Sequence, residues 1–363
     1  MQGLTVAPRR GAAHAAEAAA SASSRQDAAV SLRHVVREFR LRGGSFLSRE
    51  ETRISAVADV SFDIPRGTTF GLVGESGCGK STLSRIVAAL DRPNDGAVEI
   101  AGEDLFALGK RALRKRRRNV HLMFQDPTAS MDPRFRVNEV LREPLMIQKD
   151  GAPRDWTRRI LELMEQVGLP PSMYDRYPHE LSGGQRQRLA MARALALNPA
   201  VIVADEPVSA LDVSIQAQIL NLMRDLQRDK GLTYLFVSHD LSVVRYMADT
   251  IGVMYLGKLV EVGPAEEVYT RPRHPYTRAL IDAVPKAEAD SKKAYTISGD
   301  LPSAANPPSG CRFRTRCPLA QDICAREVPQ LDRQEGAQRV ACHFPLDAPQ
   351  TDATEPEPAT HVH

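Results

Sequence analysis

Aromatic side chains, long apolar runs and an excess of one charge are all scarce in this 363-residue sequence. Aromatic residues make up 5% of the chain, too few to favour a protein that stacks single-stranded nucleic acid on rings. The formal net charge is only +3, so no broad basic field indicates a nucleic-acid partner. No run approaches the roughly 18 apolar residues that a membrane-spanning helix needs. We therefore expect neither a nucleic-acid partner nor a membrane span.

Both ends of the chain also lack large apolar side chains. The N-terminus has no compact apolar core of the kind found in signal peptides. Glu17 and Asp27 count against a transit peptide. Residues 1–28 are rich in Ala, Ser and Arg, and residues 347–363 are rich in Pro and acidic residues. Because such segments bury little surface, we expect a disordered leader over 1–28 and a disordered tail over 347–363.

Between these ends, short apolar runs alternate with helical patterns. Residues 70–74, 201–205 and 234–238 have the composition of buried strands. Residues 156–167 and 214–229 have helical periodicity. This alternation predicts an α/β fold with a mostly parallel sheet. Near residue 270 Pro and Gly become frequent and strand patterns fade, so we place a boundary there. The predicted domains are 29–270 and 271–346.

The segment from Gly74 to Ser81 matches the phosphate-loop pattern G-x-x-x-x-G-K-[ST] at every position. It follows a buried apolar run and precedes a helical run over 81–90, which is the context that the motif needs. Lys80 would reach the β- and γ-phosphates of ATP, and Ser81 would ligate Mg²⁺. The residues expected to bind ATP here are Gly74, Glu75, Ser76, Gly77, Cys78, Gly79, Lys80, Ser81 and Thr82.

Asp205 and Glu206 end the apolar run over 201–205. Carboxylates at the end of a buried strand are costly unless they serve a cation or a water. Asp205 suits Mg²⁺ coordination, and Glu206 would act as the general base that polarises the attacking water.

Four further segments indicate a particular class of ATPase. Leu181–Gln187 reads LSGGQRQ, Gln125 lies in MFQDP, Ser209–Asp212 reads SALD, and His239 follows Ser238. In sequence order these resemble the Q-loop, signature motif, D-loop and switch histidine of nucleotide-binding subunits of ABC transporters. The resemblance covers about residues 30–270. It implies a P-loop ABC-type domain with a RecA-like core, an antiparallel β subdomain and a helical signature subdomain.

The same resemblance assigns roles to single residues. It implies that Gln125 touches Mg²⁺ and the attacking water, that His239 holds the γ-phosphate, and that an aromatic residue stacks on adenine. Phe39 is our candidate for that aromatic residue, and Phe46 is a rival.

The signature motif predicts a second subunit. Ser182 and the following glycines precede a helical run and would form a second anion cradle. One chain does not need two cradles for one γ-phosphate. The family's arrangement, in which two subunits pack head to tail and each signature covers the other's ATP, explains this. The residues expected to act on the partner's ATP are Ser182, Gly183, Gly184, Gln185 and Asp212.

After residue 260 the sequence contains GPAEEVY (263–269) and HPYTRAL (274–280). These segments resemble the C-terminal extension of the oligopeptide/dipeptide uptake subfamily, and the loop segments resemble its F-type ATPase more than its D-type. The resemblance implies a peripheral ATPase on the cytoplasmic face of the bacterial inner membrane, with a D-type or identical second ATPase, two permeases and an extracytoplasmic binding protein. Relatives that carry nickel or other small solutes remain an alternative, as does a soluble, non-transport ABC ATPase.

The C-terminal segment also holds four of the five cysteines, Cys311, Cys317, Cys324 and Cys342. Such clustering in a cytosolic chain indicates a metal site rather than disulfides. The family resemblance implies a [4Fe–4S] cluster on these four thiolates, so the extension is expected to be a small Cys-rich domain. Four cysteines also suit zinc, and His343 could replace one ligand. A segment that holds no metal is the third alternative.

Overall fold

The computed structural model describes residues 27–42, 51–127, 130–284, 297, 299–333 and 337–346. The leader expected over 1–28 and the tail expected over 347–363 lie almost wholly outside this range, as does Phe46. In the described part of the chain, no helix is long and apolar enough to cross a membrane.

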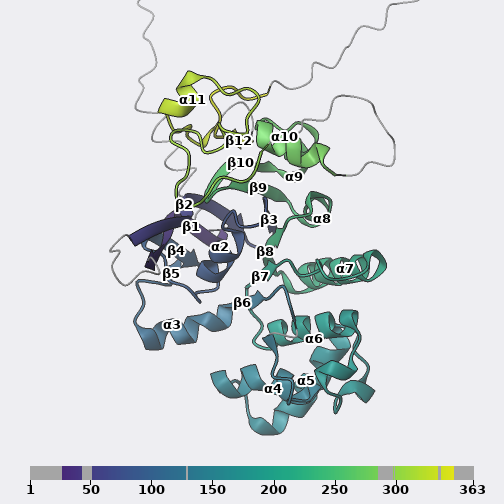
Figure 1. Cartoon of the computed structure of the whole chain (residues 1–363). Coiled ribbons are helices and arrows are strands. Elements are labelled where there is room, and N and C mark those ends of the chain that lie inside the picture. Colours follow the sequence, from purple (N-terminus) through teal and green to yellow (C-terminus); the bar gives the residue numbers. More distant parts are fainter. Residues whose placement is uncertain are drawn as a thin grey trace, which may run out of the picture.

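An eight-stranded sheet runs through the molecule (Figure 1). Its five strands β9, β3, β8, β7 and β6 are parallel, and the strands beyond β9 pair antiparallel. The order across the sheet is β11 (Asp332–Arg333), β12 (Arg339–Val340), β10 (Lys258–Pro264), β9 (Thr250–Tyr255), β3 (Thr69–Val73), β8 (Thr233–Ser238), β7 (Val201–Asp205) and β6 (Val120–Met123).

A second, four-stranded sheet is antiparallel and lies beside the first (Figure 1). Its long strands β1 and β2 pair along most of their length. The order is β2 (Glu51–Pro65), β1 (Ala28–Arg42), β4 (Asp95–Ile100) and β5 (Glu103–Asp104).

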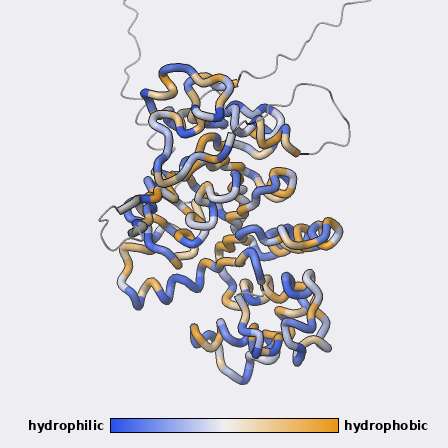
Figure 2. Tube along the Cα trace, in the orientation of Figure 1, coloured by the Kyte–Doolittle hydropathy of each residue, from blue (hydrophilic) through white to orange (hydrophobic). Residues whose placement is uncertain are grey.

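Two sets of helices lie at opposite ends of the molecule (Figure 1). The helices α4, α5 and α6 gather in a lobe beyond the edge of the parallel sheet, and α10 and α11 lie at the opposite end (Figure 1). The helix α3 is hydrophilic along most of its length and buries no residue (Figure 2). The bounds are α2 (Lys80–Val87), α3 (Lys110–Arg116), α4 (Val137–Gln148), α5 (Trp156–Gln166), α6 (Gly183–Leu195), α7 (Val213–Lys230), α8 (Leu241–Met247), α9 (Ala265–Thr270), α10 (Pro275–Asp282) and α11 (Asp322–Arg326), with 3₁₀ turns at Arg117–Asn119, Pro153–Asp155, Pro171–Met173 and Pro178–Glu180.

The central strands are apolar on both faces because both faces are covered. Successive side chains of a strand point to opposite sides. In β8, Tyr234 and Phe236 pack in one core with the helices, whereas Leu235 and Val237 pack in another core with the antiparallel sheet and α2. This double burial explains why the sequence shows continuous apolar runs here instead of alternation.

The expected strands 70–74, 201–205 and 234–238 match β3, β7 and β8 within one residue. The expected helices 156–167 and 214–229 match α5 and α7 within one residue at each end. The expected α/β cassette with an antiparallel sheet and a helical part is therefore confirmed. The extension after residue 270 contributes β11 and β12 to the main sheet, because β12 pairs with β10.

Candidate functional site

The phosphate loop connects β3 to α2, as the sequence predicts. Gly79 precedes α2 with a φ of +111°, a left-handed conformation that L side chains rarely adopt. A Cβ atom at this position would lie 2.1 Å from the carbonyl oxygen of Ala56. The loop therefore needs glycine at residue 79 both for its conformation and for its close approach to β2.

Lys80, the first residue of α2, is 5% exposed. Its Nζ donates hydrogen bonds to the carbonyl oxygens of Gly74 (2.7 Å) and Glu75 (3.0 Å). The ammonium is thus folded back onto the loop that it would help to close around a phosphate. A single buried cation at a helix N-terminus suits a polyphosphate ligand.

Asp205 lies at the end of β7 beside the start of α2. Burial raises the pKa of its carboxyl, and a hydrogen bond from the Ser81 side chain partly offsets that rise. Its Oδ1 is buried and has no hydrogen-bond partner among the described residues. A buried carboxylate oxygen without a partner, next to a serine hydroxyl, fits a divalent cation held by Ser81 and Asp205.

Glu206 brings the Q-loop and the switch histidine together. Gln125 Nε2 donates to Glu206 Oε2 at 3.0 Å, and His239 Nδ1 lies 3.2 Å from Glu206 Oε1. The three residues follow β6, β7 and β8, whose carboxyl ends meet at one edge of the parallel sheet. Glu206 has a φ of +48°, which is uncommon for a residue with a Cβ atom.

One pocket joins these groups. It has a volume of about 460 Å³. Its lining shows that the phosphate loop, Glu206 and the two partners of Glu206 face one space: Ile54, Ala56, Ser76, Gly77, Gly79, Lys80, Ser81, Thr82, Gln125, Glu206, His239 and Ala304. A pocket with one buried ammonium, a carboxylate and an imidazole can bind a nucleotide polyphosphate and activate a water beside it.

The signature residues are arranged as a helix cap. Ser182 is the N-cap of α6, where its Oγ accepts from the Gln185 backbone N–H (3.3 Å) and Gln185 Oε1 accepts from the Ser182 N–H (2.9 Å). A Cβ at Gly184 would come within 2.7 Å of Ile215, so α6 packs closely against the start of α7. Asp212 is the N-cap residue of α7.

These trans-acting candidates stay apart from the pocket. Among the described residues that line it, none belongs to the signature motif or to the D-loop. The chain therefore carries its own phosphate loop and, at a different place, a second exposed helix N-terminus.

Phe39, the candidate for adenine stacking, lies on β1. It pairs with Ile54 of β2, which lines the pocket, but Phe39 itself is not among the lining residues. The guanidinium of Arg37 lies 4.7 Å from the centre of the Phe39 ring. Phe39 is therefore near the pocket without facing it directly, and its role stays a prediction.

The four clustered cysteines are all free thiols. Burial raises the pKa of Cys342 to about 12, and the other three cysteines add to this rise, so the thiols lie close enough to influence one another. Among the described residues, however, no group of three or more His, Cys, Asp or Glu side chains is placed to hold a metal ion. The structure gives no support to a preformed cluster site, and metal binding stays a prediction.

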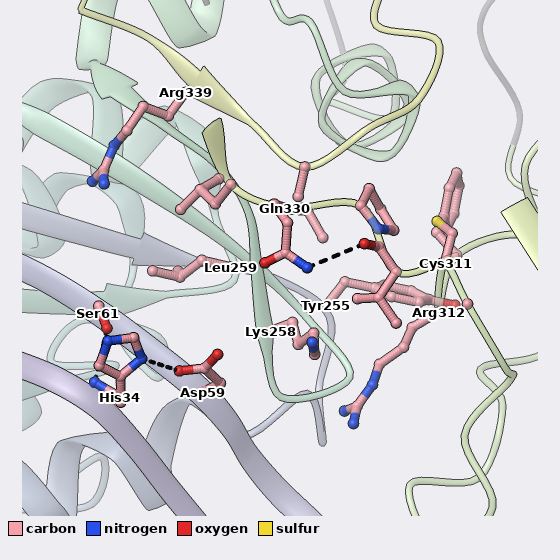
Figure 3. Close-up of a pocket in the computed structure, with 17 residues that line it drawn as sticks. His34, Asp59, Ser61, Tyr255, Lys258, Leu259, Cys311, Arg312, Gln330 and Arg339 are labelled. Atoms are coloured by element: carbon pink, nitrogen blue, oxygen red, sulfur yellow. Dashed lines mark hydrogen bonds and ion pairs between the residues drawn. The ribbon is translucent and has the colours of Figure 1, made fainter. Parts of the chain in front are cut away.

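A second pocket lies between the antiparallel sheet and the extension (Figure 3). Figure 3 shows His34 bonded to Asp59 on one side, with Lys258 and Arg312 on the other. Burial and the nearby Arg312 lower the pKa of Lys258. This pocket shares no lining residue with the nucleotide pocket.

Sequence reasoning missed three residues that touch the nucleotide pocket or its loop. Ala304 lines the pocket, the hydroxyl of Tyr276 accepts from the Glu75 N–H (2.9 Å), and Arg316 pairs with the Glu75 carboxylate. All three lie after residue 270, at least 201 positions from Glu75. No short motif could have indicated them.

The sequence matches two known protein families. The family described as ABC transporter matches residues 57–209. The family described as oligopeptide/dipeptide transporter, C-terminal region, matches residues 260–324. An ATP-binding cassette solved as a dimer in a post-hydrolysis state, bound to ADP and Pi, superposes with a TM-score of 0.58 at 31% identity, covering 65% of this chain and 98% of that one. Fold and site together define an ABC-type ATPase.

Two similar proteins show more closely to which family the chain belongs. The oligopeptide transport ATP-binding protein AppF of Bacillus subtilis is 47% identical over 326 residues, covering 89% of this chain and 99% of AppF. The di/tripeptide transport ATP-binding protein DppF of Pseudomonas aeruginosa is 47% identical, covering 86% of this chain and 96% of DppF. The chain belongs to this family of oligopeptide and dipeptide transport ATP-binding proteins.

Proposed function

We propose that this chain hydrolyses Mg·ATP to power the import of dipeptides or oligopeptides through a membrane permease. The observation that carries the proposal is the convergence of Lys80, Ser81 and Glu206 on one pocket. Asp205 is hydrogen-bonded to Ser81 beside that pocket, and AppF matches 89% of the chain.

The geometry suggests how hydrolysis proceeds. Lys80 would leave the carbonyl oxygens of the loop to bind the β- and γ-phosphates. Ser81 and Asp205 would hold Mg²⁺, which neutralises charge that develops on the phosphates. Glu206 would accept a proton from the attacking water, with its carboxylate oriented by Gln125 and His239. His239 would then be positioned to bond the γ-phosphate.

The chain needs a second ATPase subunit in this proposal. The Ser182 cap is remote from the chain's own pocket, so its N–H groups are available to another subunit's ATP. Beside the D-loop, Val213 is 82% exposed, as expected for an apolar residue that a partner covers. The facing subunit would be an identical copy or a D-type paralogue, and two permeases and a binding protein would complete the importer at the cytoplasmic face of the inner membrane.

Reconstitution tests the cargo. The full chain would be purified together with its membrane partners and placed in vesicles with their binding protein. We expect ATP hydrolysis to rise when a mixed peptide pool is supplied. Stimulation by Ni²⁺ and not by peptides would favour the alternative importer class. If the chain hydrolyses ATP but no membrane protein copurifies with it from cells, a soluble ABC ATPase would be favoured.

We further propose that the extension after residue 270 is a Cys-rich domain that binds a [4Fe–4S] cluster. The support is the donor set: four free thiols within 32 residues, whose proximity adds to the rise that burial causes in the pKa of Cys311 and of Cys342. Iron and acid-labile sulfide in anaerobically purified protein measure this directly. Stoichiometric zinc without sulfide would replace the cluster by a structural zinc site.

A further inference from the structure

We propose that the C-terminal extension is part of the nucleotide site, because Arg316 positions the phosphate loop by holding Glu75. Arg316 is then a positioning residue for ATP binding, although it lies 241 residues away along the chain. This inference rests on the proposed ATPase function and adds a determinant of nucleotide affinity outside the cassette motifs.

The contact between Arg316 and Glu75 is a bidentate ion pair. Arg316 Nη1 donates to Glu75 Oε2 at 2.7 Å, and Nη2 donates to Oε1 at 3.0 Å. The side chain of Arg316 is 8% exposed and that of Glu75 is 28% exposed. A fork of two charge-assisted bonds fixes orientation as well as distance, and its burial reduces screening by solvent. The pair therefore restrains the loop far more than an exposed surface pair would.

Glu75 is held at three separate points. Its carboxylate binds Arg316, its backbone N–H donates to the hydroxyl of Tyr276, and its carbonyl oxygen accepts from Lys80 Nζ. Two of the three anchors come from the extension. Because the third anchor is the phosphate-binding lysine, a shift of Glu75 would also move the place from which Lys80 reaches a phosphate.

Arg316 is itself fixed by its surroundings. Its Nε donates to the carbonyl oxygen of Gly299 at 3.1 Å, and its guanidinium lies 5.9 Å from the centre of the Tyr255 ring. Tyr255 ends β9, next to β3 in the main sheet. Figure 3 shows Tyr255 close to the segment with Cys311 and Arg312, five and four residues before Arg316. Arg316 is thus held by the extension itself through Gly299 and contacts the main sheet through Tyr255.

A second contact brings the extension to the pocket wall. The backbone N–H of Ser55 donates to the carbonyl oxygen of Ala304 at 3.3 Å, and Ala304 lines the nucleotide pocket beside Ile54 and Ala56. The extension therefore contacts both the phosphate end of the pocket and its β2 wall.

The test compares Arg316→Gln with wild type in the full chain. A fluorescent ATP analogue measures the dissociation constant, and steady-state hydrolysis gives KM and kcat. We expect Arg316→Gln to weaken nucleotide binding and raise KM about tenfold, with kcat changed much less. Arg316→Lys should recover part of the affinity, because it keeps the charge but not the fork. In the double variant with Glu75→Gln, the loss should not exceed that of Arg316→Gln alone.

Arg314→Gln is the matched control, because Arg314 lies in the same segment and, among the described residues, its side chain donates only to atoms of Ser309. It should leave KM unchanged. If Arg316→Gln and Arg316→Lys both fold, by melting temperature, and bind the analogue like wild type, the positioning role is wrong and the pair is only structural. If Arg316→Gln does not fold, Glu75→Gln and Arg316→Lys decide by the same measurement.

A separate variant keeps the two proposals distinguishable. Lys80→Ala should abolish binding of the analogue if the pocket is the nucleotide site. Wild-type binding by Lys80→Ala would overturn the proposed ATP site itself. Loss of binding by Lys80→Ala together with unchanged binding by the Arg316 variants would overturn only the role of Arg316.

Discussion

At the scale of single residues, Glu206 is the centre of the candidate site. It is the only residue that bonds both Gln125 and His239 in the described pocket, and it does so from a left-handed backbone conformation. A carboxylate in this place can take a proton from water, whereas the isosteric amide cannot.

We therefore expect Glu206→Gln to bind Mg·ATP with near wild-type affinity and to hydrolyse it at least about 10²-fold more slowly, the usual scale for a lost general base. Phosphate release measures the rate, and equilibrium binding of an ATP analogue measures affinity. Glu206→Asp serves as the control that keeps the charge but retracts it. Hydrolysis by Glu206→Gln at the wild-type rate would remove Glu206 from the role of base.

Some residues of the candidate site could be predicted from the sequence and others could not. The loop from Gly74 to Ser81 could be predicted because its chemistry depends on neighbouring residues, whose spacing a sequence displays. Family order gave Gln125, Glu206 and His239 separate roles, and the structure brings them together where β6, β7 and β8 end at one edge of the sheet. The partnership of Glu75 with Arg316 could not be predicted, because tertiary packing alone joins them.

At the scale of elements, the cap of α6 is the feature that a partner would use. Ser182 and Gln185 bond each other reciprocally, which leaves further N–H groups of the first turn directed outward.

Ser182→Arg places a long cation where the facing subunit's γ-phosphate would bind. We expect the variant to bind an ATP analogue at its own Lys80 site like wild type, because the two sites are separate. It should fail to dimerise with ATP when combined with Glu206→Gln, as measured by size-exclusion chromatography with light scattering. Ser182→Ala, which removes only the cap bond, is the milder comparison and should cost about 1 kcal/mol of helix stability. Loss of binding in the Ser182→Arg monomer would contradict the two-subunit arrangement.

The helix α10 carries a pH-sensitive cap. His274 Nδ1 accepts from the Tyr276 N–H at 3.0 Å, which requires the neutral ring, and burial lowers the pKa of His274 to about 3. The unfolded pKa is about 6.5. A folded pKa below the unfolded value means that this contribution to stability is complete above about pH 6.5 and is lost as pH falls from there toward 3.

His274→Asn keeps a side-chain acceptor at the cap without the titrating ring. We expect wild type to lose more stability than His274→Asn when pH falls from 7.5 to about 5, measured by denaturant midpoints at each pH. The buried Glu261 accepts from the His274 backbone N–H in wild type, and the substitution keeps that N–H, so its titration cancels in the difference. Parallel pH profiles for the two proteins would show that His274 does not titrate with folding.

At the scale of the whole molecule, two kinds of information combine. Period and composition predicted the α/β core, because buried strands and amphipathic helices have local patterns. The antiparallel sheet was expected only from the family resemblance. A change in composition alone placed a boundary near residue 270. The composition does change there, yet the extension contacts the cassette. It does so through the short strands β11 and β12 and through Arg316 and Ala304. Two-residue strands and single contacts have no periodicity in the sequence, so they could not be predicted from it.

The pairing of β12 with β10 has a consequence for anyone who shortens this protein. A chain that ends at residue 270 would leave β10 as an unpaired edge, with the N–H and C=O groups of Glu261 and Val262 no longer facing Val340 and Arg339. Exposed apolar edge strands recruit other chains. Such a truncated cassette should therefore aggregate at concentrations where the full chain stays dispersed, visible as rising light scattering. Because β12 of the extension pairs with β10 across the boundary near residue 270, the extension would protect the β10 edge from pairing with other chains. This protection would not depend on the cargo.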